Sequence, residues 1–155
     1  MKKLTTLSSL LLVGMIITIA SCSKNSSQPS IIQATYRGAT HTFTSAQGMY
    51  IYQSADYGVA QAIESGTNDT TSVTFQGSNI GSYPIGSSYP NFLTFIIGGT
   101  TYSSSNHGSY GTIHITRLDA SSSMATGDFS GTLYTTDHHD SLPVTQGLIS
   151  VKYQF

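Results

Sequence analysis

GTIHITRL at residues 111–118 and GLISVKYQF at residues 147–155 are the two stretches that decide the fold of this chain. Apolar and polar residues alternate along both. Ile113 and Ile115 share one face of the first stretch, and Val151 belongs to the apolar face of the second. Strict alternation is typical of a β-strand with one buried face. We therefore expect the C-terminal third to consist of antiparallel strands.

Similar short runs, separated by turn residues, recur along the rest of the chain. They cover residues 31–36, 41–44, 49–53, 57–65, 70–76, 80–85, 92–97 and 128–134. The run at 57–65 is also compatible with a helix, and the apolar run at 92–97 suggests a strand buried on both faces. No helical crossover pattern is present, which disfavours a parallel sheet. The sequence predicts an all-β fold, an antiparallel β-sandwich or flattened β-barrel of about 8–10 short strands.

The composition supports this prediction and excludes one class of partner. Charged residues make up 8% of the chain, far below the roughly 25% of an average domain. Serine, threonine, glycine and tyrosine, which favour turns and strands, take their place. After residue 21 the chain has four scattered basic residues against seven acidic ones. We therefore expect no nucleic-acid partner, because such binding needs clustered positive charge.

The N-terminus has the order of a secretory signal peptide. Lys2 and Lys3 precede a mainly apolar segment, and small residues lead to Cys22. The uninterrupted apolar run, residues 10–17, is shorter than the about 20 residues that span a bilayer. A transmembrane helix, a buried core helix and an ordinary cleaved signal are the alternatives. The quartet at residues 19–22 resembles a bacterial lipobox, which implies cleavage between Ser21 and Cys22 and lipidation of Cys22.

A lipidated Cys22 would define three regions. Residues 1–21 are the predicted lipoprotein signal peptide, residues 22–30 the lipidated tether and residues 31–155 a single β-domain. The two or three acyl chains that the resemblance implies would anchor the protein stably. Because Cys22 is the chain's one cysteine, no disulfide or free thiol is then expected. The tether has no acidic residue, whereas surface-exposed lipoproteins of the Bacteroidota, which the chain resembles, often carry an acidic signal just after the cysteine. The resemblance therefore implies the cell envelope, at the outer membrane and facing the periplasm.

Several C-terminal motifs occur in an order that resembles a known family. They are the segments at residues 111–116, 127–134 and 144–147, with Asp119 between the first two. This order is similar to that of small Bacteroidota lipoproteins of a domain-of-unknown-function family. The resemblance implies a lipid-anchored β-domain and transfers no catalytic residue. Independently, we interpret Gly127, Gly131 and Gly147 as a turn, a close approach or bulge, and a hairpin entry.

The densest polar cluster is DHHD at residues 137–140. Carboxylates and imidazoles bind zinc or copper, and His41, His107 or His114 are possible additional ligands in space. However, neighbouring residues on an extended chain point to opposite faces, so His138 and His139 rarely serve one ion. A solvated loop is the alternative that we favour. We expect neither a metal nor a cofactor.

Catalytic signatures are missing from the sequence. No Gly-x-Ser-x-Gly elbow lies between a strand and a helix, and Glu64 is the one glutamate, which excludes a Glu–Glu glycosidase pair. We expect a non-enzymatic structural or binding role in the envelope, with a protein or glycan partner. A hydrolase, which would need Asp137 or Asp140 in a cleft with a histidine, is the third hypothesis.

The second hypothesis is a glycan- or small-ligand-binding lipoprotein with a tyrosine-lined pocket or face. Tyrosine combines an aromatic face with a hydroxyl group, which suits sugars and peptides, although strands also use it for ordinary cross-strand packing. The candidates are Tyr50, Tyr52, Tyr57, Tyr83, Tyr89, Tyr102 and Tyr110.

Two tripeptides resemble the O-glycosylation motif of exported Bacteroidota proteins. They are Asp-Thr-Thr at residues 69–71 and Asp-Ser-Leu at residues 140–142. Their acceptors would be Thr70 and Ser141, which we expect in turns. An unmodified mass for the lipidated protein would contradict this hypothesis.

Overall fold

The computed structural model describes residues 29–44, 47–51, 57–77, 79–119 and 121–152. The predicted signal peptide, Cys22 and most of the tether lie outside these residues. The strands are β1 (Ile31–Tyr36), β2 (Ala39–Phe43), β3 (Gln47–Ile51), β4 (Tyr57–Ile63), β5 (Thr70–Gln76), β6 (Gly81–Gly86), β7 (Phe92–Ile97), β8 (Thr100–Ser103), β9 (Tyr110–Asp119), β10 (Met124–Tyr134) and β11 (Ser141–Lys152). Within the described residues, no helix is long and apolar enough to cross a membrane.

The all-β prediction is confirmed, including for residues 57–63, which form β4 rather than a helix. The described residues contain eleven strands, slightly more than expected, and all their pairings are antiparallel. The last three strands are not short, because they contain 10, 11 and 12 residues. The strand order β2-β1-β11-β10-β8-β7-β5-β4-β3, with β9 and β6 branching from β10, gives a nearly closed, barrel-like sheet.

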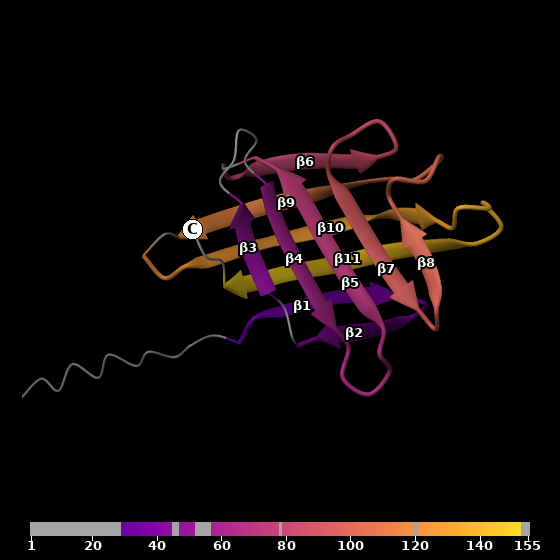
Figure 1. Ribbon diagram of the computed structural model, residues 1–155, viewed down its shortest axis with the longest axis horizontal. Coiled ribbons are helices and arrows are strands. Elements are labelled where there is room, and N and C mark those ends of the chain that lie inside the picture. The colour runs from indigo at the N-terminus through magenta and orange to yellow at the C-terminus, as the bar shows by residue number, and fades with distance from the viewer. Residues whose placement is uncertain (1–28, 45–46, 52–56, 78, 120, 153–155) are drawn as a thin grey trace, which may run out of the picture.

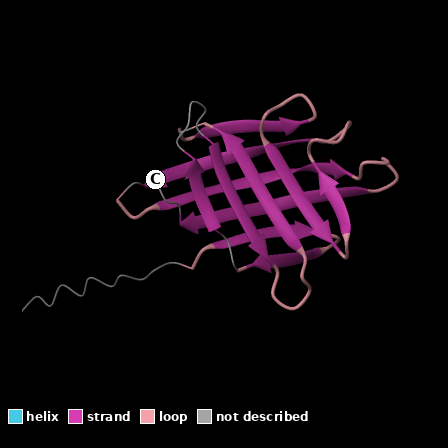
Figure 2. Cartoon of the chain, viewed as in Figure 1, coloured by secondary structure: helices cyan, strands magenta, loops and turns pink. Residues whose placement is uncertain are grey.

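This sheet is folded into two layers that cross at a steep angle (Figures 1 and 2). The front layer contains β3, β4, β5, β7 and β8, and the back layer contains β2, β1, β11, β10, β9 and β6. Strongly twisted sheets commonly pack in this near-orthogonal way. The architecture therefore combines the two alternatives that the sequence left open, the sandwich and the flattened barrel.

Backbone pairing joins the two layers at two narrow seams. At the first, Tyr134 of β10 pairs with Ser103 of β8. At the second, Phe43 at the end of β2 forms a bridge with Glu64 beyond β4, and the Thr44 amide donates to the Ile63 carbonyl. Each seam carries few backbone hydrogen bonds, so side chains must supply much of its stability.

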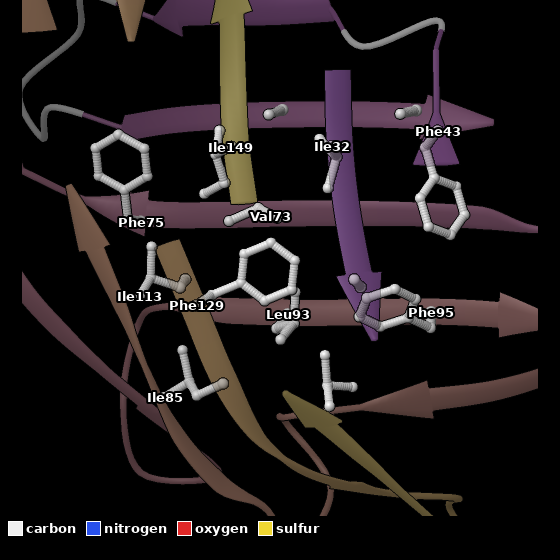
Figure 3. Packing of buried hydrophobic residues seen from close by; sticks show 14 of the residues in the cluster. Ile32, Phe43, Val73, Phe75, Ile85, Leu93, Phe95, Ile113, Phe129 and Ile149 are labelled. Atoms are coloured by element: carbon white, nitrogen blue, oxygen red, sulfur yellow. The ribbon is translucent and has the colours of Figure 1, made fainter. Parts of the chain in front are cut away.

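The core fills the space between the layers (Figure 3), where the ring of Phe129 from the back layer lies 6.3 Å from that of Phe95 from the front layer. Side chains of both layers are fully buried there, including Phe95, Ile113 and Ile149. Its largest fully buried side chains also include Ile32, Phe43, Ile85, Tyr102, Ile115, Leu133 and Leu142.

The prediction that residues 92–97 are buried on both faces is wrong. Leu93 and Phe95 are buried, but Phe92 and Ile96 on the opposite face are 37% and 40% exposed. The reason is that β7 belongs to a two-layer packing in which only one face of each layer meets the core. Its other face is open to solvent and carries an apolar surface.

The predicted runs 31–36 and 41–44 lie in the first hairpin, which has a tight turn. Arg37 and Gly38 connect β1 to β2, and their φ angles are 51° and 79°. Two successive positive φ values define a type I′ turn, whose twist matches that of paired strands. Ala39 and Thr40, which lie between the predicted runs 31–36 and 41–44, already belong to β2.

The three C-terminal glycines all lie within strands, so two of their predicted roles need correction. Gly127 is in β10 beside a register shift, not in a turn. Gly147 is in the middle of β11 opposite Phe129, not at a hairpin entry. A β-carbon at Gly147 would collide with the Phe129 ring, whereas Gly131 makes the predicted close approach, to Tyr110 and Gly111. Long, closely packed strands, rather than turns, are what require these glycines.

Candidate functional site

The first seam carries a buried tyrosine held between two charged groups. The Tyr102 hydroxyl donates to Asp140 Oδ2 at 2.5 Å and accepts from Arg37 Nη2 at 2.7 Å. Arg37 and Asp140 are themselves 3.5 Å apart. The three residues come from β8, from the β10–β11 turn and from the β1–β2 turn. This Arg37–Tyr102–Asp140 cluster therefore ties three segments together at one end of the molecule, on the right in Figure 1.

The electrostatics of this cluster favour a charged Asp140 and a neutral Tyr102. The hydrogen bond from Tyr102, followed by that from the Ser141 backbone amide, lowers the pKa of Asp140. Burial, followed by the bond to Asp140, raises the pKa of Tyr102. At neutral pH the carboxylate is charged and the phenol is neutral, which is the protonation state that the observed hydrogen bonds require.

The predicted DHHD cluster does not bring its own histidines together. Asp137 accepts from Thr135 Oγ1 at 2.6 Å and from the His139 amide at 3.2 Å, and the Thr135 bond is the main cause of its lowered pKa. His138 takes a positive φ of 58°, and its ring lies 5.7 Å from that of His107. The described residues include no group of three or more potential metal ligands.

The other two histidines considered as ligands lie elsewhere. In β9, His114 Nδ1 is 3.3 Å from Asp128 Oδ2. At the second seam, His41 Nδ1 is 3.0 Å from Glu64 Oε1. His41 and His114 therefore do not join His138.

The second seam is closed by an aromatic stack and the His41–Glu64 pair. The rings of Tyr36 and His41 are parallel within 7° and 3.8 Å apart. The Tyr36 hydroxyl is buried and has no hydrogen-bond partner within the described structure. Burial, followed by the charge of Glu64, raises the pKa of Tyr36. Sequence reasoning missed this constellation because its members come from three segments without a shared motif.

A hollow of about 470 Å³ lies on the outer face of the front layer. Its lining includes Gln61, Ile63, Thr70, Ser72, Thr94 and Ile96. Thr70 pairs with Ile63 on one side and Ile96 on the other, and these isoleucines are 50% and 40% exposed. Among the described residues, the lining has aliphatic, hydroxyl and amide groups but no charged side chain. Such a surface can contact an uncharged ligand through both hydrogen bonds and apolar packing.

The described residues of this lining include no tyrosine, and the tyrosine-lined pocket or face stays a prediction. Tyr102 is buried, and the Tyr83 hydroxyl donates to the Asn79 carbonyl. Tyr89 and Tyr110 are 48% and 64% exposed, but they lie near Gly86, at the end of the β6–β9 pair. The side chains of Tyr50, Tyr52 and Tyr57 lie outside the part of the chain whose side chains the structure describes.

The two candidate glycosylation acceptors lie at strand starts rather than in turns. Thr70 is the first residue of β5, and Ser141 is the first residue of β11. The aspartate that precedes each of them already forms hydrogen bonds. Asp69 Oδ1 accepts from the Gly98 amide at 2.9 Å, and Asp140 is bonded to Tyr102. O-glycosylation at Thr70 and Ser141 stays a prediction.

Fold and surface together define a barrel-like, antiparallel all-β domain with an uncharged hollow on its front layer. The chain belongs to the DUF6252 family, a domain of unknown function, whose model matches residues 28–151. This match covers every described strand except the last residue of β11. Comparisons with curated proteins and with solved structures gave no match.

Proposed function

We propose that this protein is a lipid-anchored, non-enzymatic component of the cell envelope whose β-domain binds a partner through the hollow on its front layer. The order of residues 1–22 supports the anchor. The nine residues of the tether, 22–30, reach at most about 30 Å when extended. An acylated Cys22 would therefore keep the domain close to the membrane surface, which we take to be the periplasmic side of the outer membrane.

The uncharged hollow is the observation that carries the binding role. Soluble domains normally cover their outer sheet faces with charged and polar side chains. Here Phe92 and Ile96 of β7 and Ile63 at the end of β4 are exposed on the same layer. Apolar groups that gather on one face are typical of an interaction site.

The placement of the acidic groups supports a non-enzymatic role over a hydrolase. Asp137 is bonded inside its own turn. Asp140 accepts a hydrogen bond from the Tyr102 hydroxyl, which in turn accepts one from Arg37. Glu64 is paired with His41 at the other seam. In the described structure these carboxylates fasten segments of the fold, and none of them lines the hollow.

A neutral glycan is the ligand that the lining favours, which makes glycan binding the second candidate function. Thr70, Ser72 and Thr94 offer hydroxyl groups, and Gln61 offers an amide. The C–H faces of a sugar can pack on isoleucine side chains while its hydroxyl groups exchange hydrogen bonds with this polar row. The lack of charge in the lining disfavours acidic sugars and charged peptides.

The anchor is tested by replacing Cys22 with alanine. This variant should escape globomycin-sensitive processing and leave the membrane fraction, because its acceptor for acyl chains is gone. Fractionation that is unchanged from wild type would refute the anchor, whatever the domain binds.

Binding is tested separately with a panel of neutral glycans and envelope peptides. Ile96→Arg places a charge in the hollow and should abolish binding of the neutral glycan that wild type retains. Ile80→Arg is the matched control, because Ile80 is 60% exposed and does not line the hollow. Equal loss in both variants, or no glycan retained by wild type, would contradict the proposed site.

A further inference from the structure

Two loops meet beside the first seam and bring together two histidines that are far apart in sequence. His107 lies in the β8–β9 loop, and His138 lies in the β10–β11 turn. Their ring centroids are 5.7 Å apart, with an interplanar angle of 65°. Both side chains are exposed, so an ion from solvent can reach them.

The separation of the two rings fits coordination of a single ion. With metal–nitrogen distances of about 2.0–2.1 Å, two imidazoles on one tetrahedral ion have ring centroids about 5 Å apart, and at wider angles about 6 Å. The observed 5.7 Å falls within this span. At this separation, rotation of the two exposed side chains can bring one nitrogen of each ring to the same ion.

Hydrogen bonds between the loops hold the pair in position. Asn106 Nδ2 donates to the Tyr134 carbonyl at 2.6 Å, and the Tyr134 amide donates to Ser109 Oγ at 3.0 Å. In the turn, the His138 amide donates to the Thr135 carbonyl at 3.1 Å. His107 is thus next to a residue that is bonded across the seam, and the backbone of His138 is bonded within its own turn, which lowers the ordering cost of binding.

We propose that His107 and His138 bind one divalent transition-metal ion, with water completing its coordination. Imidazole nitrogen suits Cu²⁺, Ni²⁺ and Zn²⁺, and the general order of stability places Cu²⁺ first. Such an ion would link the β8–β9 loop to the β10–β11 turn. Metal binding should therefore also raise the thermal stability of the domain, because the ion binds the folded state and not the separated loops.

The alternative is that the two rings only pack against each other. The His138 ring also contacts that of Tyr134, with a centroid distance of 6.0 Å, so aromatic packing alone can account for its position. Packing and ligation make different predictions for a residue that keeps the ring and loses the nitrogen donor. His107→Phe is such a change.

The experiment titrates Cu²⁺ and Ni²⁺ into the full chain carrying Cys22→Ala, so that no thiol competes, with calorimetry and thermal unfolding as readouts. His107→Ala and His138→Ala should each weaken binding at least tenfold and remove the metal-dependent rise in Tm. His139→Ala and His114→Ala are matched controls that should bind like the parent. His107→Phe should keep the metal-free Tm and lose the metal response.

Three results would overturn the proposal. The first is no measurable binding by the parent chain. The second is a loss in His139→Ala or His114→Ala as large as that in His138→Ala, which would mean unspecific surface binding. The third is an unchanged metal response in His107→Phe, which would leave aromatic packing as the sole role of the pair. None of these results bears on the anchor or on the hollow.

Discussion

Single ionisable residues in this domain mainly fasten loops. Asp119 accepts hydrogen bonds from Ser121 and Ser122 and pairs with Arg117 in the β9–β10 turn. Asp137 caps the β10–β11 turn in the same way through Thr135. In a chain with so few charges, each carboxylate that is committed to a turn is one fewer for catalysis. This use of charge is consistent with a binding or structural protein.

We expect these turn carboxylates to make the domain sensitive to acid. Hydrogen bonds from Ser121, Thr135 and Tyr102 are the leading causes of the lowered pKa of Asp119, Asp137 and Asp140 respectively. A folded-state pKa below the unfolded value of about 3.9 adds stability above that pH, and this stability is lost as pH falls. The urea midpoint should therefore change little from pH 7 to 5 and decrease below about pH 4.

Asp119→Asn is the variant that checks this cause. It should be less stable than wild type at pH 7 but should lose less stability between pH 5 and 2, because asparagine does not titrate. A pH profile parallel to that of wild type would show that the Asp119 carboxylate does not contribute to the acid sensitivity.

A second prediction at the residue scale concerns the core face of β11. Val151 is 3% exposed, whereas Leu148 on the same strand is 40% exposed. Val151→Asp buries a charge without a partner, which costs several kcal/mol, of order the whole stability of a small domain. We expect it to unfold the protein in circular dichroism. Leu148→Asp is the control and should remain folded; a folded Val151→Asp would mean that this face is solvated.

Secondary-structure elements show where sequence reasoning succeeded. The alternation in residues 70–76 predicted β5 with its bounds, and Val73 and Phe75 share its buried face. The period of two is a local property, so it can be recognised without the fold. The side of β7 that faces solvent could not be predicted, because Phe92 and Ile96 are as apolar as their buried neighbours. Only the packing of two layers distinguishes them.

The candidate sites were harder to predict because they join elements that are distant in sequence. Tyr102 and Asp140 are 38 residues apart and meet through β8 and the β10–β11 turn. Neither has a neighbour that indicates this role, and a composition rich in tyrosine made Tyr102 a candidate for an exposed face. The antiparallel order β10-β8 determines the contact, and that order follows from the global topology.

The Tyr102 hydroxyl gives a prediction at the scale of elements. Tyr102→Phe removes the bonds to Arg37 and Asp140 while it keeps the buried ring. We expect a loss on the order of 1 kcal/mol in the free energy of unfolding, since each such hydrogen bond contributes modestly. Tyr110→Phe, at a 64% exposed position, should be neutral. Equal urea midpoints for both variants would show that the cluster does not stabilise the first seam.

The whole molecule consists of two layers with a shared core and two thin seams. Two polar clusters and a histidine pair lie at these seams: Arg37–Tyr102–Asp140 and the two histidines at one, and Tyr36–His41–Glu64 at the other. The hollow lies on the outer face of β4, β5 and β7. It borders the second seam, because the carbonyl of Ile63, one of its lining residues, accepts the Thr44 amide there.

This arrangement predicts the order in which the molecule opens. Met124–Tyr134 of β10 is paired with β11 on one side and with β9 on the other along most of its length, whereas the first seam is a single pair and the second a single bridge. In native-state hydrogen exchange, amides inside β10 should exchange only through global unfolding. The Thr44 amide, which bonds across the second seam, should exchange at lower denaturant through local opening.

Glu64→Gln should speed exchange of the Thr44 amide. It should change the exchange of the β10 amides only by as much as it changes the free energy of global unfolding. Protection that is equal at Thr44 and within β10 would mean that the layers open as one cooperative unit and that the seams are not weak points of the fold.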